Sequence, residues 1–195
     1  MYPGSILFIA RKKRDQSLPG RLLRLDHRAF TAVAVHRNRA GDMVLPRLSR
    51  AADNSILWIV AAILMAGFGG RRGRRAAVRG IGSILIASLT VNQGAKRLAR
   101  RPRPPLRNVP ATRRLKSVPL TTSFPSGHSA SAAAFTTAVF MEWPAAGRLI
   151  APIAGLVAYS RVYVGVHYPG DVIVGVMAGT GIARLTRLLD RAGPP

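Results

Sequence analysis

The sequence predicts an all-α fold: an integral membrane bundle of helices, preceded by a basic helical region. Hydrophobic residues make up 48% of the 195 residues, and many of them lie in long runs without charge. Thirty Lys and Arg against seven Asp and Glu give a net charge of +23, and most of these cations fall between the apolar runs. The runs are also rich in Gly, Ala and Ser, as in residues 129–134, and such small residues allow helices to pack closely in lipid.

Five runs are expected to form membrane-spanning helices. Residues 55–70 and 80–95 carry no charge, and residues 117–141 are uncharged as well, with a helix expected from about Ser129. The fourth run, 149–166, contains one charge, and the fifth extends from about 170 to 189. These runs are near the short limit, because a hydrocarbon core of about 30 Å needs roughly 20 helical residues. A soluble bundle of buried helices is the alternative, but it would leave little polar surface.

The first 50 residues have a different composition. Residues 11–50 are basic, with short apolar clusters interrupted by proline and glycine. We expect one or two helices lying along the membrane surface, with a partly disordered basic tail as the alternative. The chain therefore divides into a basic segment, 1–50, and a transmembrane domain, 51–191.

Composition also excludes several classes of site. The chain has no cysteine, so it has no disulfide, thiol nucleophile or cysteine-based zinc site. The high positive charge alone would suit a nucleic-acid-binding protein. However, such a protein would not need cations segregated between apolar runs, so membrane lipids rather than nucleic acid are the expected partners.

Three polar clusters lie at the ends of the apolar runs. They are residues 96–104, residues 124–129 and residues 160–171, and the last two contain His128 and His167. If the second to fifth runs all span the membrane, strict alternation places the three clusters on one side. The topology therefore predicts that two histidines, one carboxylate and several cations gather at one lipid boundary.

Part of this group is suited to holding a phosphate. Lys96, Arg103 and Arg161 are cations that can bind phosphate oxygens. Ser126 offers a hydroxyl, and Gly127 allows close approach to backbone N–H groups at the start of a helix, where anions bind well.

The remaining residues can carry a phosphoryl transfer. Asp171 lies four residues after His167, where its carboxylate can fix the tautomer of the ring and leave the other nitrogen free to attack. His128 can then protonate the departing oxygen as a general acid. A metal site made of the two histidines and Asp171 is the alternative, but the surrounding cations would repel the ion. We therefore expect neither a metal nor a cofactor.

The three clusters resemble the signature of the type 2 phosphatidic acid phosphatase superfamily, which reads K-x6-R-P, P-S-G-H and S-R-x5-H-x3-D. The matching positions follow this order and spacing: Lys96, Arg103, Pro104, Pro125, Ser126, Gly127, His128, Ser160, Arg161, His167 and Asp171. The resemblance covers roughly residues 55–189. It implies a membrane-bound lipid phosphatase without a metal requirement, in which His167 forms a phosphohistidine, Asp171 orients it and His128 protonates the lipid leaving group. It also implies that Lys96, Arg103, Ser126, Gly127 and Arg161 hold the phosphate.

The resemblance leaves several alternatives open. Members of this superfamily commonly have six spanning helices, whereas the apolar runs indicate five. Vanadium-dependent haloperoxidases share the signature but are soluble, and a lipid phosphotransferase would use the same intermediate. We expect a multi-pass protein of the plasma membrane that acts on phosphatidic acid, phosphatidylglycerol phosphate or a polyprenyl phosphate or diphosphate. The sequence does not determine the particular lipid, the side of the membrane on which the site lies or the oligomeric state.

Overall fold

The regular elements of the computed structural model are all helical in the residues that it describes, which are 18–36, 38–95, 97, 99, 101–116 and 121–192. The prediction of an all-α chain is therefore confirmed. The longer helices, in chain order, are α2 (Leu18–Val35), α3 (Arg39–Ala51), α4 (Ile56–Phe68), α5 (Gly70–Ser88), α7 (Gly127–Glu142), α8 (Pro144–Tyr163) and α9 (Pro169–Ala192). The shorter ones are η1 (Asp53–Ser55), a π-helical extension of α5 named η2 (Leu89–Ala95), η3 (Leu106–Asn108) and η4 (Ala111–Arg113).

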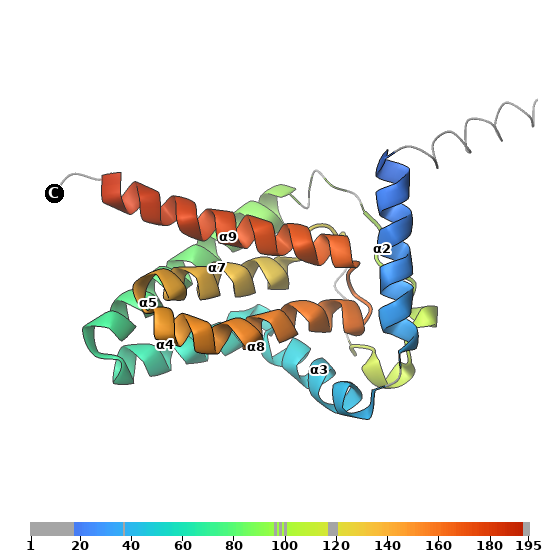
Figure 1. The fold of residues 1–195 in the computed structure, drawn as a ribbon, viewed down its shortest axis with the longest axis horizontal. Helices are drawn as coiled ribbons and strands as arrows, with labels where there is room; N and C mark the ends of the chain where they lie inside the picture. Colours follow the sequence, from blue (N-terminus) through green and yellow to red (C-terminus); the bar gives the residue numbers. More distant parts are fainter. Residues whose placement is uncertain are drawn as a thin grey trace, which may run out of the picture.

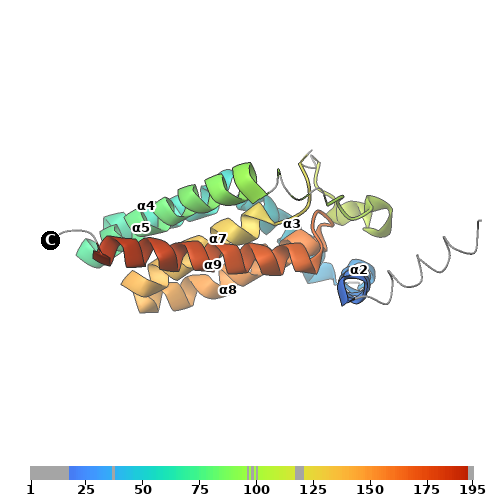
Figure 2. The same ribbon diagram turned by 90° about the horizontal axis from the view of Figure 1, so that it is seen from above.

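Helix α7 is the centre of the bundle. It packs against α5, α8 and α9, and α4 packs on the outer side of α5. These five helices run along the long axis of the molecule, whereas α2 stands across one end of it (Figure 1). The view from above shows the same arrangement, with α4 and α5 on one side of α7 and α8 on the other (Figure 2).

Small residues bring these helices close together, as the sequence indicated. A Cβ atom on Gly179 would collide with the backbone of Ala130, and one on Gly175 would lie 2.5 Å from the carbonyl oxygen of Ser126. Gly80 of α5 likewise leaves room for the ring of Phe135, which a Cβ atom would approach to 2.7 Å. The glycines therefore set how closely α5 and α9 approach α7.

Two helices begin earlier than the apolar runs predicted. Helix α5 begins at Gly70, not near residue 80, and its first turns carry exposed arginines at positions 71, 72, 74 and 75. An exposed arginine costs a helix little, so these charges mark where the apolar run begins but not where the helix begins. Helix α8 begins at Pro144, since proline is well tolerated in the first turn of a helix.

The number of membrane spans stays a prediction. Among the described residues, only Pro169–Asp190 is long and apolar enough by itself to cross a bilayer. The pair Arg39–Ala51 and Asp53–Phe68 meets the same criterion together, but it is bent by 65°. The other expected spans fall short: α4 has 13 residues and α7 has 16, while α5 and α8 contain arginines and are not apolar enough.

The described part of the basic N-terminal segment forms two helices, α2 and α3, and residues 1–17 of that segment lie outside the described residues. Arg113 of η4 links these two helices to the end of α8, because its guanidinium lies 4.2 Å above the ring of Tyr163. Its guanidinium donates to the carbonyl oxygen of Ala34 at 3.2 Å, to that of His36 at 2.5 Å and to the Asp42 carboxylate at 2.5 Å. Helix α2 is thereby held across the end of the bundle where α8 ends and α9 begins.

Candidate active site

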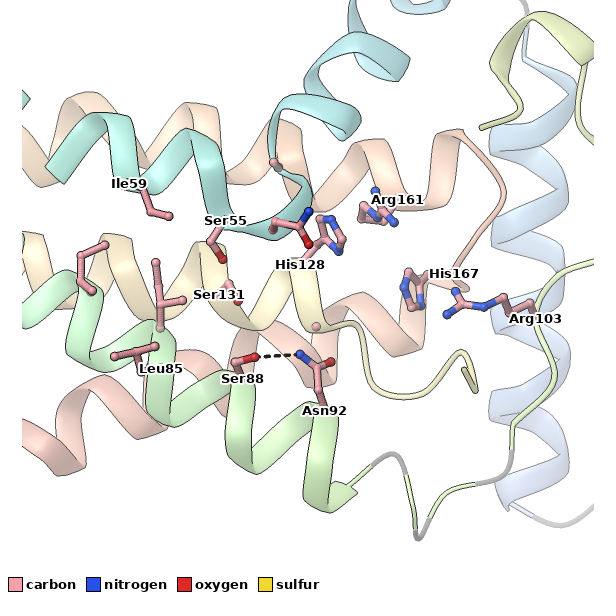
Figure 3. A pocket seen from close by; sticks show the side chains of 15 residues that line it. Ser55, Ile59, Leu85, Ser88, Asn92, Arg103, His128, Ser131, Arg161 and His167 are labelled. Carbon is pink, nitrogen blue, oxygen red and sulfur yellow. Dashed lines mark hydrogen bonds between the residues drawn. The ribbon is translucent and has the colours of Figure 1, made fainter. Parts of the chain in front are cut away.

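A cavity of about 470 Å³ lies between α4, α5, α7 and the end of α8. Its lining changes along its length (Figure 3): arginine and histidine side chains gather at one end, Ile59 and Leu85 lie at the other, and serines lie between them. The residues around it are Ala52, Asn54, Ser55, Ile59, Ile81, Ile84, Leu85, Ser88, Asn92, Arg103, Gly127, His128, Ser131, Arg161 and His167. One cavity thus joins a strongly basic end to an apolar end.

The N-terminus of α7 forms part of the wall. Ser126 caps this helix, and its Oγ accepts hydrogen bonds from the N–H of Ser129 at 3.4 Å and from the Ser129 hydroxyl at 2.9 Å. Next to it, a Cβ atom on Gly127 would lie 2.5 Å from Oδ1 of Asn92, so this position favours glycine. The first N–H groups of a helix attract anions, which makes this wall suitable for a phosphate.

His128 follows on the same helix turn and is paired with an acidic residue. Its Nε2 lies 2.8 Å from Oδ1 of Asp53, and the same oxygen lies 3.7 Å from Nη1 of Arg161. Asp53 belongs to the one-turn helix η1, where the chain bends between α3 and α4. One carboxylate therefore contacts two of the predicted site residues.

Arg161 reaches the cavity from the C-terminal part of α8. Its side chain is 1% exposed, and its Nη1 donates to Oγ of Ser49 at 2.5 Å. Its Nε has no hydrogen-bond partner among the described residues. A buried guanidinium with an unused donor can accept an anionic ligand at little further cost.

His167 lies in the connection between α8 and α9, next to the start of α9. The residue is 2% exposed, and its Nδ1 lies 3.6 Å from Oδ2 of Asp171, slightly beyond hydrogen-bond distance. The Asp171 side chain is fully buried and also accepts a hydrogen bond from the N–H of Tyr168 at 2.9 Å. Because Nδ1 is directed toward the carboxylate, Nε2 is the nitrogen of His167 left for chemistry.

Burial controls the protonation of this ring. It lowers the pKa of His167 from 6.5 to about 4; Asp171 opposes this change, and the positive charges of Arg161 and Arg103 add to it. At neutral pH the ring is therefore uncharged and keeps a lone pair on one nitrogen. A neutral imidazole is the form that can act as a nucleophile.

Arg103 lies beside His167 in Figure 3. It donates from Nη1 to the carbonyl oxygen of Val166 at 2.7 Å and from Nε to that of Thr121 at 3.0 Å. Burial lowers its pKa, and the charge of Asp171 opposes that change. The structure thus brings seven of the eight predicted residues to one end of the bundle: Arg103, Ser126, Gly127, His128, Arg161, His167 and Asp171. The eighth, Lys96, lies outside the described residues.

Sequence reasoning missed several residues that contact this site, and two of them are charged. Asp53 pairs with His128 across 75 positions, and Arg101 donates from Nη1 to Oδ1 of Asp171 at 2.6 Å across 70 positions. The chain contains only seven acidic residues, so each of them was a weak candidate for pairing with a histidine or arginine of the site, and Asp53 is one of them. Within the described residues, no group of three or more His, Cys, Asp and Glu side chains is arranged to hold a metal ion.

Comparison with known proteins identifies relatives of this chain. The model of the PAP2 superfamily matches residues 77–192. The decaprenylphosphoryl-5-phosphoribose phosphatase of Mycobacterium tuberculosis is 35% identical over 151 residues, which cover 76% of this chain and 80% of that protein. The undecaprenyl-diphosphatase of Sulfolobus acidocaldarius is 32% identical over 139 residues, covering 71% of this chain and 66% of that protein.

A solved structure has a similar fold. The transmembrane PAP2-type phosphatidylglycerolphosphate phosphatase of Bacillus subtilis superposes with a TM-score of 0.69 at 22% sequence identity. The match covers 97% of this chain and 94% of the Bacillus protein. At this level of identity, the likeness shows the fold that the two chains share.

Proposed function

Because this chain is a phosphatase that belongs to the PAP2 superfamily, we propose that it hydrolyses a phosphate ester of a membrane lipid through a phosphohistidine on His167. The observation that carries the proposal is the position of His167, buried between the Asp171 carboxylate and the arginines of the cavity. Its lowered pKa keeps the ring neutral at pH 7. This arrangement supplies a nucleophile, its orienting carboxylate and the charge that a phosphate requires.

In the first step, Nε2 of His167 attacks the phosphorus atom. A P–N bond forms while the P–O bond to the lipid breaks, and His128 gives its proton to the departing lipid oxygen. In the second step, a water molecule attacks the phosphorus and gives its proton back to His128. The P–N bond breaks, inorganic phosphate leaves, and both histidines regain their starting states.

The phosphate oxygens are held by positive charge and by backbone N–H groups. Arg103 and Arg161 line the basic end of the cavity, and the start of α7 at Ser126 and Gly127 supplies the anion-binding helix terminus. Lys96 completes the set by its position in the signature. Such groups act mainly by stabilising charge that builds up in the transition state.

The lining of the cavity also bears on the substrate. Ser55, Ser88, Asn92 and Ser131 lie between the basic end and the apolar end near Ile59. Side chains that donate and accept hydrogen bonds suit a polar group placed between the phosphate and the hydrocarbon chain. This lining supports a substrate with such a group, for example a glycerol or sugar, and the lipid panel below compares it with a phosphate attached directly to a prenyl chain.

The location of the protein and the division of the chain are part of the same proposal. A lipid substrate requires access from a bilayer, so we place the protein in the plasma membrane as a multi-pass protein. In this proposal residues 51–191 form the phosphatase domain and residues 1–50 form a basic segment that precedes it.

Phosphate release by the detergent-purified protein tests this function. The panel contains phosphatidic acid, phosphatidylglycerol phosphate, a polyprenyl phosphate, a polyprenyl diphosphate and a decaprenyl-linked phosphoribose phosphate, each with EDTA present. We expect release from at least one lipid, its loss in His167→Ala and no loss in His36→Ala, a matched exposed histidine. Wild-type release rates in His167→Ala would overturn the mechanism, and a strict need for a divalent metal would overturn the metal-free chemistry.

A further inference from the structure

Helix α2 reaches the active site through a chain of three charged side chains. Arg101 donates from Nη2 to Oδ2 of Asp26 on α2 at 2.6 Å, and from Nη1 to Oδ1 of Asp171 on α9 at 2.6 Å. The other oxygen of Asp26 accepts a hydrogen bond from the N–H of Gly170 at 2.7 Å. One guanidinium therefore bridges two carboxylates: Asp171 belongs to the first turn of α9, and Asp26 contacts that turn.

This bridge is largely shielded from water. The exposed fractions of the side chains are 12% for Asp26, 18% for Arg101 and 0% for Asp171. The guanidinium of Arg101 also lies 4.2 Å above the ring of Tyr168, and His27 stacks on the same ring with centroids 4.6 Å apart. Ion pairs in such surroundings are only weakly screened, and the removal of one partner leaves a buried charge without compensation.

The geometry fixes the direction of the catalytic carboxylate. Arg101 holds Oδ1 of Asp171, while the N–H of Tyr168 holds Oδ2 from the side of His167. With both oxygens held, Oδ2 stays directed at Nδ1 of His167, 3.6 Å away. A carboxylate free to rotate would lose this direction, and with it the tautomer that leaves Nε2 able to attack.

Asp26 has a second effect, on charge. Without Asp26, the positive charge of Arg101 would weaken the interaction between Asp171 and His167, because both groups interact with the same carboxylate. Asp26 binds the other side of the guanidinium and offsets part of that charge. The pair therefore holds Asp171 in place and still leaves it an acceptor for the His167 N–H.

We propose that Asp26 and Arg101 are positioning residues for the Asp171–His167 pair, so that α2 forms part of the catalytic apparatus. This inference rests on the proposed function, because it concerns how the nucleophile of that reaction is held. Neither residue lines the cavity, so each acts through Asp171 and touches no reacting atom.

The test compares Asp26→Asn, Arg101→Met and the double variant with the wild-type protein on the preferred lipid. We expect Arg101→Met to lower kcat roughly 10- to 100-fold, which is the size of effect produced by a misplaced catalytic group. Asp26→Asn should lower kcat by less. KM should stay within about twofold in both, since the phosphate-binding groups of the cavity are unchanged. The double variant should be no slower than Arg101→Met, because Asp26→Asn keeps a side-chain oxygen that can accept the Gly170 N–H, so that the charge it removes acts through Arg101.

The matched control is Asp190→Asn, which removes a partner of Arg79 at the far end of the bundle, where the two side chains lie 3.6 Å apart. This variant should keep the wild-type kcat. A merely structural bridge predicts a different pattern: less folded protein and a lower melting temperature, but an unchanged kcat per folded molecule. That pattern would overturn the inference. The inference would also fail if the loss of kcat in the double variant equalled the product of the losses in the two single variants.

Rapid-quench measurement of the phosphohistidine separates this inference from the function on which it rests. If the wild-type protein forms no acid-labile phosphoenzyme, the proposed function fails. If the wild-type protein forms it and both variants form it at the same rate, only the positioning role fails. Slower formation in the variants, with the lipid affinity unchanged, is the expected result.

Discussion

His167 and His128 line the same cavity, but their surroundings differ. The His167 residue is 2% exposed, and its carboxylate partner Asp171 is fully buried and held by Arg101 and a backbone N–H. The His128 side chain is 23% exposed, and its partner Asp53 is 45% exposed. Asp53 also lies on the single turn η1, whose other two residues, Asn54 and Ser55, both have a positive φ.

This contrast fits the different tasks that we propose for the two rings. A nucleophile must be neutral and must present one nitrogen in one direction, which a buried and fixed environment ensures. A general acid must lose a proton in one step and regain it in the next, which requires contact with a water molecule. Burial on one side of the cavity and exposure on the other therefore separate the two roles.

The largest expected effect is the replacement of the nucleophile. His167→Ala should lower turnover by at least about 10⁴-fold with every substrate, because no other group in the site can form the covalent intermediate. The measurement is phosphate release from the preferred lipid and from p-nitrophenyl phosphate, whose leaving group needs no proton. Activity restored by the aryl substrate would contradict a nucleophilic role for this ring.

The replacement of the acid should depend on the leaving group. His128→Ala should lower lipid turnover about 10²- to 10⁴-fold, the usual contribution of a general acid. With p-nitrophenyl phosphate the loss should be at least tenfold smaller, because that leaving group departs without protonation. An equal loss with both substrates would show that His128 binds the phosphate and does not transfer a proton.

The burial of His167 should also appear in the stability of the folded protein. Its folded pKa of about 4 lies below the ordinary 6.5, so between these values the unfolded chain binds a proton that the folded protein does not. Stability should therefore fall as the pH falls through this window, at about 1.4 kcal/mol per pH unit and by up to about 3 kcal/mol in total. Melting curves in detergent from pH 7 to pH 4 measure this effect.

The control for this experiment is a pair of glutamine variants. His167→Gln removes the titrating ring and should show a shallower loss of stability than the wild-type protein in the same window. His36→Gln changes an exposed histidine outside the site, and it should keep the wild-type melting temperature at pH 7. A slope in His167→Gln equal to that of the wild-type protein would mean that folding does not change the protonation of His167.

The sequence predicted the helical class and the residues of the signature because both depend on short-range patterns. Residues such as Ser126, Gly127 and His128 are neighbours, and the spacing of His167 and Asp171 is one helical turn. Where α5 begins could not be read from the apolar run, since exposed arginines continue a helix without cost to its packing.

The acidic residues that contact the site from distant parts of the chain could not be predicted in the same way. Asp26 lies 75 positions before Arg101, and Asp53 lies 75 positions before His128, and no periodicity links such pairs. Asp26 lies moreover in a basic segment that composition assigned to the membrane surface. Only the packing of α2 across the start of α9 brings it to the carboxylate that it supports.

The smallest expected effect concerns the exposed partner of the acid, and it should have the opposite sign. Oδ1 of Asp53 lies 2.8 Å from Nε2 of His128 and 3.7 Å from Nη1 of Arg161, so it competes with a phosphate oxygen for both groups. Asp53→Asn should therefore lower KM by about 1.4- to fivefold, which corresponds to the roughly 0.2–1 kcal/mol of an exposed ion pair.

The same substitution at Asp171 is the matched comparison. Asp171→Asn should leave KM nearly unchanged and lower kcat strongly, because the buried carboxylate orients the nucleophile and does not compete with the substrate. Steady-state kinetics of the two variants on one lipid give both constants. A rise of KM in Asp53→Asn would mean that this carboxylate helps to hold the substrate, and the contrast between the two sides of the cavity would then lie in exposure alone.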